Sequence, residues 1–535
     1  YFFDKQELKK WDISSNEILS NKTIYSAIQL QDESFVLGTI SNGIIHLSKN
    51  GEFKYQITKT LGLSNNTVLS VFEDIDHNIW LGLDNGINVV NASSPFRFFV
   101  KKDNFWGTIY ASTIFKNNLF IGTNQGLYVK KMGNNNDFEF VKNTQGQVWN
   151  LDIIDETLFC SHDSGTFIIN DENAILVSGT EGTWGVKKIN ENLLLQGCYD
   201  GLYILSKQNN QWKLRNKLEG FSNSSKYFDI INNNQIFVNH EYKGVFKLKT
   251  DVNFTKIIES VKDESVDKGL HSSLFKFNKH LFYASKNGIF KFSKANNCFK
   301  IDSAFSILIS ADKFLTGKVL IDHIGNKLWS FTRDDIRFLS PGKLSNEPVL
   351  KLIPIKGYLH KGATGYENII NLSEKKYLVG TSEGFLVLDL NRIQDPKDFN
   401  ININGISNYI IDRKKISVEL TNSNEFSYKE NNLEFTFSVP NFNKTSLVEY
   451  QYQLKGLREN WSDLSEENSI LLENLPPRKY TLKVRAFIDD RPSNNIANYS
   501  FEIKKPWYLS IIFLIIYFII FCFIIYGFHI FSKKH

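Results

Sequence analysis

A two-strand motif that recurs along residues 20–390 constrains the fold more than any other feature. In residues 72–91, FEDIDHNIWLGLDNGINVVN, an apolar strand around Trp80 is followed by the pair Asn85-Gly86 and a second apolar strand. An Asn-Gly pair between two apolar runs is a strong hairpin signal, because both residues tolerate positive φ. Nine such units occur, with turns at Gly43, Gly86, Gly126, Gly165, Gly201, Gly244, Gly288, Asp335 and Gly384.

The spacing of these units indicates the blades of a β-propeller. Successive turns lie between 36 and 49 residues apart, which leaves room for one strand before and one after each hairpin. A four-stranded sheet cannot bury its faces alone, so neighbouring units must pack around a common axis. We therefore predict that residues 1–395 form one complete seven-bladed ring preceded by the end of another, truncated propeller. A single ring of eight or nine blades is the alternative.

Composition supports an all-β fold and gives no sign of nucleic-acid binding. The 44 Phe and 22 Tyr residues favour strands. The net charge of +5 is small for 535 residues, and no basic stripe is present. Cys160, Cys198, Cys298 and Cys522 lie far apart and match neither a zinc site nor a disulfide framework.

The pattern changes near residue 396 to longer alternating strands separated by polar turns. Such strands, over residues 396–505, are typical of an immunoglobulin-like or fibronectin-like sandwich. Within LPPRKYTLKVRA, Tyr480 stands where a tyrosine corner is expected. Tyr450, Tyr452 and Leu454 share one face of a strand because side chains alternate, and we interpret them as core residues.

Residues 506–529 are predicted to cross a membrane. Trp507 to Phe528 contains no charged residue and exceeds the ~20 apolar positions that a spanning helix needs. Residues 530–535 would then begin the cytoplasmic region. The chain has no initiator Met and no signal-peptide pattern, so we expect it to be part of a longer protein.

Two stretches resemble a known family. GLSNNTVLSVFEDIDHNIWLGLDNGINVVN resembles the propeller repeat of periplasmic sensor regions in Bacteroidetes-type membrane-bound regulators, and EYQYQLKGLRENW resembles the triple-tyrosine (Y_Y_Y) domain of the same regulators. The resemblance implies an extracytoplasmic sensor of an oligosaccharide or other nutrient, with residues 1–505 in the periplasm and the helix in the inner membrane. It also implies a homodimer formed through the sandwich and helix, and an output that is a histidine kinase or a LuxR-type module beyond residue 535.

One aligned position carries large aromatic residues in four consecutive units. In each of these units we aligned the residue that stands ten positions before the second residue of the first hairpin strand. These residues are Tyr110, Trp149, Trp184 and Tyr227. This position starts the innermost strand, so the rings would surround the mouth of the central channel. They could stack on a sugar ring, with nearby hydrogen-bonding partners among Asn150, Asp152, Lys187 and Asp229. Alternatively, they wedge between blades as core.

No sequence pattern indicates catalysis, a metal or a cofactor. Signatures of serine hydrolases, zinc proteases and phosphate-binding loops are absent from the sequence. Glu73, Asp74 and Asp76 could suggest a calcium site, but the other repeats lack matching carboxylates, so we interpret the three residues as a turn that caps its hairpin. A membrane-anchored glycan-active enzyme and a passive surface scaffold are the alternatives to a sensor.

Overall fold

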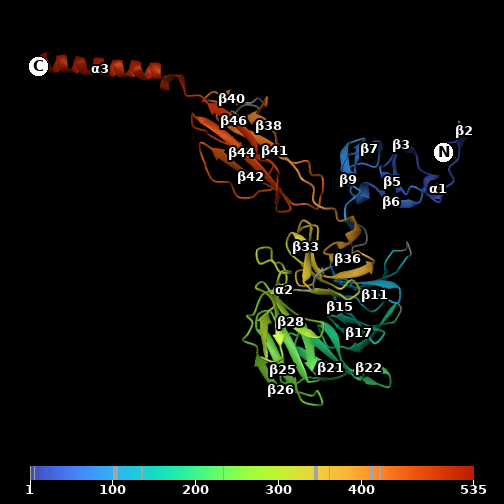
Figure 1. Cartoon of the computed structure of the whole chain (residues 1–535). Coiled ribbons are helices and arrows are strands. Elements are labelled where there is room, and N and C mark those ends of the chain that lie inside the picture. The colour runs from blue at the N-terminus through green and yellow to red at the C-terminus, as the bar shows by residue number, and fades with distance from the viewer. Residues whose placement is uncertain are drawn as a thin grey trace. The chain divides into compact units, whose positions relative to one another are not determined.

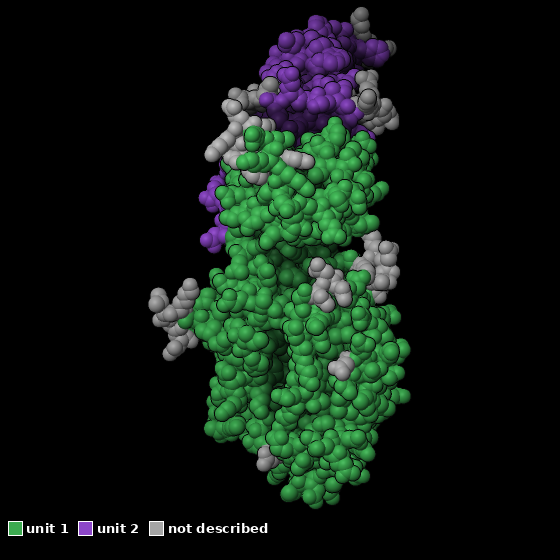
Figure 2. All heavy atoms as spheres, turned by 90° about the vertical axis from the view of Figure 1, so that its right-hand side faces the viewer, with its two compact units in different colours: residues 1–394 green, residues 395–535 purple. Residues whose placement is uncertain are grey.

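The computed structural model divides the chain into two compact units, residues 1–394 and residues 395–535 (Figure 2). It describes residues 2–4, 7–100, 106–133, 137–170, 172–232, 234–342, 347–360, 362–409, 415–420 and 423–534. The first unit consists mainly of four-stranded antiparallel sheets, and the second consists of a sandwich followed by one long helix (Figure 1). The predicted fold class, all-β with propeller blades, a sandwich and one apolar helix, is confirmed.

Seven four-stranded sheets between residues 96 and 389 make up the ring. The first three are β11 (Ile109–Phe115), β12 (Asn118–Thr123), β13 (Leu127–Lys131) and β14 (Glu139–Phe140); β15 (Val148–Ile154), β16 (Thr157–His162), β17 (Gly165–Asn170) and β18 (Asn173–Ser178); and β19 (Gly185–Asn190), β20 (Leu193–Cys198), β21 (Gly201–Gln208) and β22 (Gln211–Lys217).

The next three blades follow the same order along the chain. They are β23 (Tyr227–Asn232), β24 (Gln235–His240), β25 (Gly244–Thr250) and β26 (Ile257–Lys262); β27 (Ser273–Phe277), β28 (His280–Ser285), β29 (Gly288–Ser293) and β30 (Cys298–Ile301); and β31 (Leu320–Asp322), β32 (Lys327–Phe331), β33 (Asp335–Pro341) and β34 (Pro348–Pro354). A short helix, α2 (Ser303–Ser306), precedes the sixth blade. The first strand of each sheet is innermost, since β11 contacts β15, β15 contacts β19 and β23 contacts β27.

The seventh blade closes the ring with a strand from the other end of the repeat array. β35 (Ile369–Ser373), β36 (Lys376–Thr381) and β37 (Gly384–Asp389) are completed by β10 (Phe96–Val100). β10 pairs antiparallel with β37, with Arg97 opposite Val387 and Phe99 opposite Phe385. This pairing shows a complete ring of seven blades, and the alternative of one ring of eight or nine blades is wrong.

Two further sheets precede the ring. They are β3 (Ile24–Gln29), β4 (Phe35–Thr39), β5 (Ile44–Leu47) and β6 (Phe53–Ile57), followed by the three-stranded sheet of β7 (Val68–Glu73), β8 (Asn78–Leu83) and β9 (Gly86–Asn91). Shorter elements in this region are β1 (Phe2–Asp4), β2 (Glu7–Lys9), α1 (Asn16–Leu19) and η1 (Lys59–Leu61). The two sheets share an apolar core that includes Ile44 and Leu81, both fully buried.

The hairpin turns differ slightly from the sequence interpretation. In residues 78–91 the strands β8 and β9 pair from Leu83 opposite Gly86, so the turn is Asp84-Asn85 and Gly86 opens the second strand. Gly86 has φ 96°, whereas Asn85 does not have positive φ. At Gly384, where φ is 147°, a Cβ atom would lie 2.2 Å from the carbonyl oxygen of Phe99, so glycine is needed for the outer strand to approach.

The acidic turn at residues 73–76 organises its own hairpin. The Asp74 carboxylate accepts hydrogen bonds from the backbone N–H of Asp76 and Asn78, at 2.9 and 2.8 Å, and from the indole N–H of Trp80, at 2.8 Å. These hydrogen bonds lower the pKa of Asp74, although its burial acts in the opposite direction. The interpretation of this segment as a capping turn is therefore confirmed.

The second unit contains a two-sheet sandwich. One sheet is β38 (Asn402–Asn408), β39 (Ile416–Val418), β41 (Leu433–Ser438) and β43 (Ser469–Leu472), and the other is β40 (Ser423–Phe426), β42 (Val448–Lys455), β44 (Lys479–Ile488), β45 (Arg491–Pro492) and β46 (Ala497–Ile503). Tyr450 and Leu454 are buried in its core, and Tyr452 packs against that core half-buried. The Tyr480 hydroxyl donates a hydrogen bond of 2.7 Å to the Pro476 carbonyl, which makes the predicted tyrosine corner.

The last helix has the length and composition of a membrane span. α3 (Ile511–Lys534) follows Pro506 and a short 3-10 turn, η3 (Trp507–Leu509). Within its segment Ile511–Lys533 the most apolar 18 residues have a mean hydropathy of 3.0, and the apolar side chains are exposed around the helix. A further 3-10 turn, η2 (Leu390–Arg392), ends the propeller unit.

The closing strand β10 offers a direct test of the ring. Phe96 is 5% exposed and packs with Trp329 and Ile353, whereas Phe98 of the same strand is 40% exposed. Phe96→Ala should lower the free energy of unfolding by about 3–5 kcal/mol because it leaves a cavity where β10 meets the last two blades. Phe98→Ala, the control, should cost about 1 kcal/mol or less. Urea unfolding of the two variants measures the difference, and equal losses would contradict the closure.

Candidate functional site

The four aromatic residues found by aligning the repeats lie at the starts of four innermost strands. Tyr110, Trp149 and Tyr227 are the second, second and first residues of β11, β15 and β23, and Trp184 immediately precedes β19. All four side chains are half-buried. They therefore surround the end of the central channel at which the innermost strands begin.

Three of the four rings form one contact cluster with a fifth aromatic residue, Tyr366. The ring centroids of Tyr110 and Trp149 are 5.1 Å apart, and those of Trp149 and Trp184 are 5.2 Å apart. Tyr366 contacts the same three rings, at 5.2, 5.2 and 6.1 Å. These are the separations of packed aromatic pairs. The rings thus contact one another across neighbouring blades and still keep part of their surface open, a feature of both the ligand-binding and the core interpretation.

Tyr227 joins the cluster through the loop that carries Tyr366. Its hydroxyl donates a hydrogen bond of 3.0 Å to the carbonyl oxygen of Gly365. The neighbouring Lys226 places its Nζ 3.4 Å from the ring centroid of Tyr366 and 5.4 Å from that of Trp184. Such an approach of an ammonium to ring faces is a cation–π contact. We define the mouth cluster as Tyr110, Trp149, Trp184, Tyr227, Tyr366 and Lys226.

The two indole N–H groups of the mouth cluster differ in their partners. Trp184 Nε1 donates to the Ser224 hydroxyl at 3.0 Å. Trp149 Nε1 is buried and makes no hydrogen bond of normal geometry with the residues that the structure describes, although it lies close enough to the Tyr199 hydroxyl to oppose the burial that raises the pKa of Tyr199. A buried N–H without a good acceptor favours a ligand or water that supplies one.

The polar residues expected beside the aromatic rings bind one another instead. Asn150 donates to the Asp152 carboxylate at 3.0 Å, and Lys187 forms an ion pair with Asp229. Asp152, Lys187 and Asp229 line a separate pocket of about 350 Å³ further along the innermost strands, and none of the mouth cluster lines it. Burial raises the pKa of Asp152 to about 6. These side chains are not arranged as partners for a ligand on the aromatic rings, so that part of the expectation is wrong.

Several charged residues at the mouth were missed by the repeat alignment. The residue directly before the aligned position is Lys226 in the fourth blade, Lys318 in the sixth and Glu367 in the seventh. Tyr366 was also missed, because it stands two residues before the aligned position of its blade, which Asn368 occupies. A search of the two positions before the aligned one for charge and aromaticity would have found all four residues, Lys226, Lys318, Tyr366 and Glu367.

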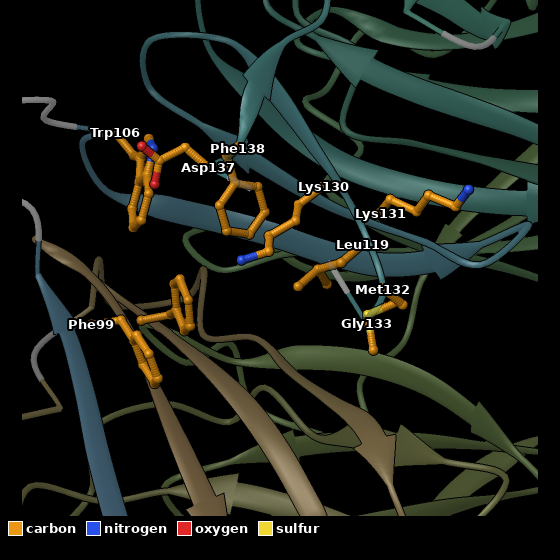
Figure 3. A pocket seen from close by; sticks show the side chains of 10 residues that line it. Phe99, Trp106, Leu119, Lys130, Lys131, Met132, Gly133, Asp137 and Phe138 are labelled. Carbon is orange, nitrogen blue, oxygen red and sulfur yellow. The ribbon is translucent and has the colours of Figure 1, made fainter. Parts of the chain in front are cut away.

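A second hollow lies where the ring closes (Figure 3). It has a volume of about 280 Å³ and is lined by aromatic residues of the first and last blades, with Phe99 projecting from one wall and Phe138 and Lys130 from the other. Phe99 stacks on Phe385 at 4.8 Å, and Trp106 stacks on the same ring at 5.8 Å. These contacts stabilise the closure, and we assign this hollow a structural role.

Comparison with known families identifies the domain next to the membrane helix. The family model described as "Y_Y_Y domain" matches residues 441–505. The chain contains a Y_Y_Y domain. The match covers most of the strands of the sandwich, from before β42 to the end of β46. A search of curated proteins finds no match.

Solved structures with a similar fold include extracellular domains of bacterial proteins. The extracellular domain of a protein described as a hybrid two-component system from B. thetaiotaomicron is 18% identical, with a TM-score of 0.65, over 90% of this chain and 68% of that one. Another such extracellular domain from the same bacterium is 18% identical over 91% of this chain and 70% of that one, with a TM-score of 0.45. The first likeness supports the fold of propeller blades followed by a Y_Y_Y domain.

Two lysines at the mouth should make stability depend on pH. Burial lowers the pKa of Lys226 to about 7 and that of Lys318 to about 8, from 10.5. Between these values and about pH 10.5 the unfolded chain binds more protons than the folded one, so stability should rise with pH over this window. We expect the melting temperature to increase from about pH 6.5 to pH 9.5, and to increase less in Lys226→Met. An equal slope in the variant and the parent would show that Lys226 is solvated.

Proposed function

We propose that the chain is the ligand-sensing, extracytoplasmic part of a single-span receptor, and that the mouth cluster binds an oligosaccharide. The fold of propeller blades and Y_Y_Y domain, similar to the extracellular domains of bacterial two-component systems, supports the sensor role. The oligosaccharide and its binding position are inferences from the chemistry of the mouth cluster.

The observation that carries the proposal is the aromatic surface at one end of the channel. The ring centroids of Tyr110 and Trp149, and of Trp149 and Trp184, lie within 5.2 Å of each other, and part of each ring stays accessible. The C–H faces of a sugar ring pack well on such surfaces, while its hydroxyl groups need polar partners. The buried N–H of Trp149 and the hydroxyls of Tyr110 and Tyr199 are suitable partners.

An enzyme of glycans is a weaker interpretation of the same residues. Glycoside hydrolysis needs two carboxyl groups that face a shared space about 5–9.5 Å wide. At the mouth the structure places the carboxyl group of Glu367, which is 5% exposed and accepts a hydrogen bond from the Gly365 N–H, and Asp152 and Asp229 of the other pocket already accept hydrogen bonds from Asn150 and Lys187. Binding therefore explains the mouth better than catalysis does.

Signal transmission would pass through the Y_Y_Y domain to α3. Ligand binding would shift the equilibrium between two arrangements of this domain, which helix α3 would carry across the inner membrane. We propose a homodimer through the Y_Y_Y domain and α3, with a histidine kinase or LuxR-type output beyond the membrane. Light scattering of the detergent-solubilised chain tests the dimer, which a monomer mass would contradict.

Two tryptophan substitutions test the binding site. An aromatic stacking contact contributes ~0.5–1.5 kcal/mol beyond the area it buries, so Trp149→Ala and Trp184→Ala should each weaken oligosaccharide binding about tenfold. Binding of neutral and acidic oligosaccharides of three to six sugar units to the detergent-solubilised chain is measured by calorimetry.

Trp212→Ala is the matched control for these variants. Trp212 lies on the outermost strand β22, where it contacts Phe159 at 6.3 Å and not the mouth cluster. This variant should lose stability without losing affinity. If Trp149→Ala and Trp184→Ala lower the melting temperature but leave affinity unchanged, the rings are core and the proposed site is wrong.

Membrane sidedness is tested by protease protection. In spheroplasts, whose inner membrane is intact, residues 1–505 should be digested by added protease, because α3 would hold them on the periplasmic side. Spheroplasts whose inner membrane has been lysed are the control. Protection of the propeller in intact spheroplasts would contradict the proposed topology.

A further inference from the structure

The mouth of the channel is divided into an aromatic arc and a charged arc. The aromatic residues of the aligned position come from the first four blades, Tyr110 to Tyr227, whereas the position before it carries Lys226, His271, Lys318 and Glu367 in the fourth to seventh blades. Lys226 and Tyr227 are adjacent residues, so the two arcs meet in the fourth blade. A ligand on the rings would therefore lie beside these charges.

The two lysines of the charged arc are mostly buried but lack an ion pair. Neither Lys226 nor Lys318 has a carboxylate oxygen within 4.0 Å among the described residues. Lys226 Nζ instead lies over the ring of Tyr366, 3.3 Å from the point where a Cβ atom on Gly365 would be. Burying an ammonium without a counter-charge is costly, and this cost lowers the pKa of both lysines.

In the same region of the mouth, one carboxylate oxygen of Glu367 has no hydrogen-bond donor among the described residues. Glu367 is 5% exposed, and its Oε1 accepts a hydrogen bond of 2.9 Å from the Gly365 N–H. Its Oε2 is buried and makes no hydrogen bond to any described residue. The carboxylate acts electrostatically on both Lys226 and Lys318, so the three groups share one region of the mouth. A buried acceptor without a donor costs free energy that a ligand hydroxyl would recover.

We propose that the saccharide bound at the mouth is acidic, with its carboxylate between Lys226 and Lys318, one hydroxyl donating to Glu367 Oε2, and its ring on Trp184 and Tyr366. This inference rests on the proposed function and specifies the ligand class of that site. A neutral saccharide would leave both ammonium groups buried without a counter-charge. A small inorganic anion would leave the aromatic faces and the Glu367 oxygen without partners. A uronic acid, which has one carboxylate, several hydroxyls and an apolar ring face, satisfies all three kinds of group.

The same geometry couples binding to proton uptake. Lys226 is faced by the charged groups of Lys318, Glu367 and Glu241 and by the rings of Tyr227 and Tyr366. Burial and the charge of Lys318 hold the pKa of Lys226 at about 7 in the free protein. A bound carboxylate favours the ammonium form and raises this pKa, so the complex holds more protons than the free protein above about pH 7. Affinity for an acidic saccharide should thus be highest below about pH 7 and fall as pH rises.

The experiment compares matched saccharides that differ only in charge. Oligomers of galacturonate, glucuronate and mannuronate are each titrated beside their methyl esters into the detergent-solubilised full chain. A hydrogen bond to a charged group contributes ~1.5–3 kcal/mol, so at least one acid should bind more than about tenfold tighter than its ester near pH 6.5. Raising the pH to about 8.5 should lower the affinity for the acid about tenfold and leave the affinity for the ester unchanged.

Lysine variants assign the selectivity to the charged arc. Lys226→Met and Lys318→Met keep the approximate length of the side chain and remove its charge. Each should lower the affinity for the acid about tenfold and change the affinity for the ester about twofold or less. Lys286→Met is the control, because Lys286 is an exposed lysine on the β28–β29 turn. Glu367→Gln, which retains an acceptor oxygen, should preserve the preference for the acid.

The outcomes separate this inference from the proposed function. The acidic ligand would be overturned if acids and esters bound equally tightly, or if only neutral oligosaccharides bound. If Trp149→Ala weakened that binding, the saccharide site itself would still stand. Selectivity that persists in both Lys→Met variants would also overturn the inference. If neither acids, esters nor neutral oligosaccharides bind, both proposals fail.

Discussion

The antiparallel pairing of β10 with β37 is the interaction on which the propeller depends. Six blades are built from consecutive strands and need only local chain reversals. The seventh lacks an outer strand until Phe96–Val100 supplies it from the other end of the array. This contact joins the first and last blades, and Phe96 fills the core between the sixth and seventh. Without it the innermost strands would not surround an axis, and the channel mouth would not exist.

At the mouth of the channel, the start of the innermost strand carries aromatic residues in some blades and charged residues in others. In the first three blades the aligned position carries a ring that contacts its neighbours, and in the fourth, sixth and seventh blades a charged residue stands one position earlier. The loop around Gly365 connects the two arcs, because its carbonyl accepts from Tyr227 and its N–H donates to Glu367. Buried lysines near ring faces are destabilising in isolation. A fold with seven packed blades can tolerate them, and such local destabilisation is typical of sites that await a ligand.

The fold was largely predictable from the sequence, and the site only in part. Hairpins depend on neighbouring residues, so their nine positions could be read from glycines and alternating apolar residues. The tyrosine corner at Tyr480 and the turn at Asp74 are local for the same reason. Tyr366, Lys226, Lys318 and Glu367 escaped the alignment because they stand beside the aligned position, and no periodic signal shows which neighbours turn toward the channel. Asp152, Lys187 and Asp229 were assigned to the wrong place because nearness in sequence was taken for nearness to the rings.

The sequence by itself determined what the local interactions of strands and helices dictate: repeated hairpins, an alternating sandwich and an apolar helix, each specified within a few tens of residues. Only the tertiary structure decided that seven of the nine repeats close into one ring, since that depends on pairing Arg97 with Val387, far apart in the chain. It also decided that rings from separate blades meet at Tyr366 and that Lys226 lies over the Tyr366 ring without a carboxylate partner among the described residues. Such contacts arise where strands distant in sequence converge on the propeller axis, and closure of the ring creates that convergence.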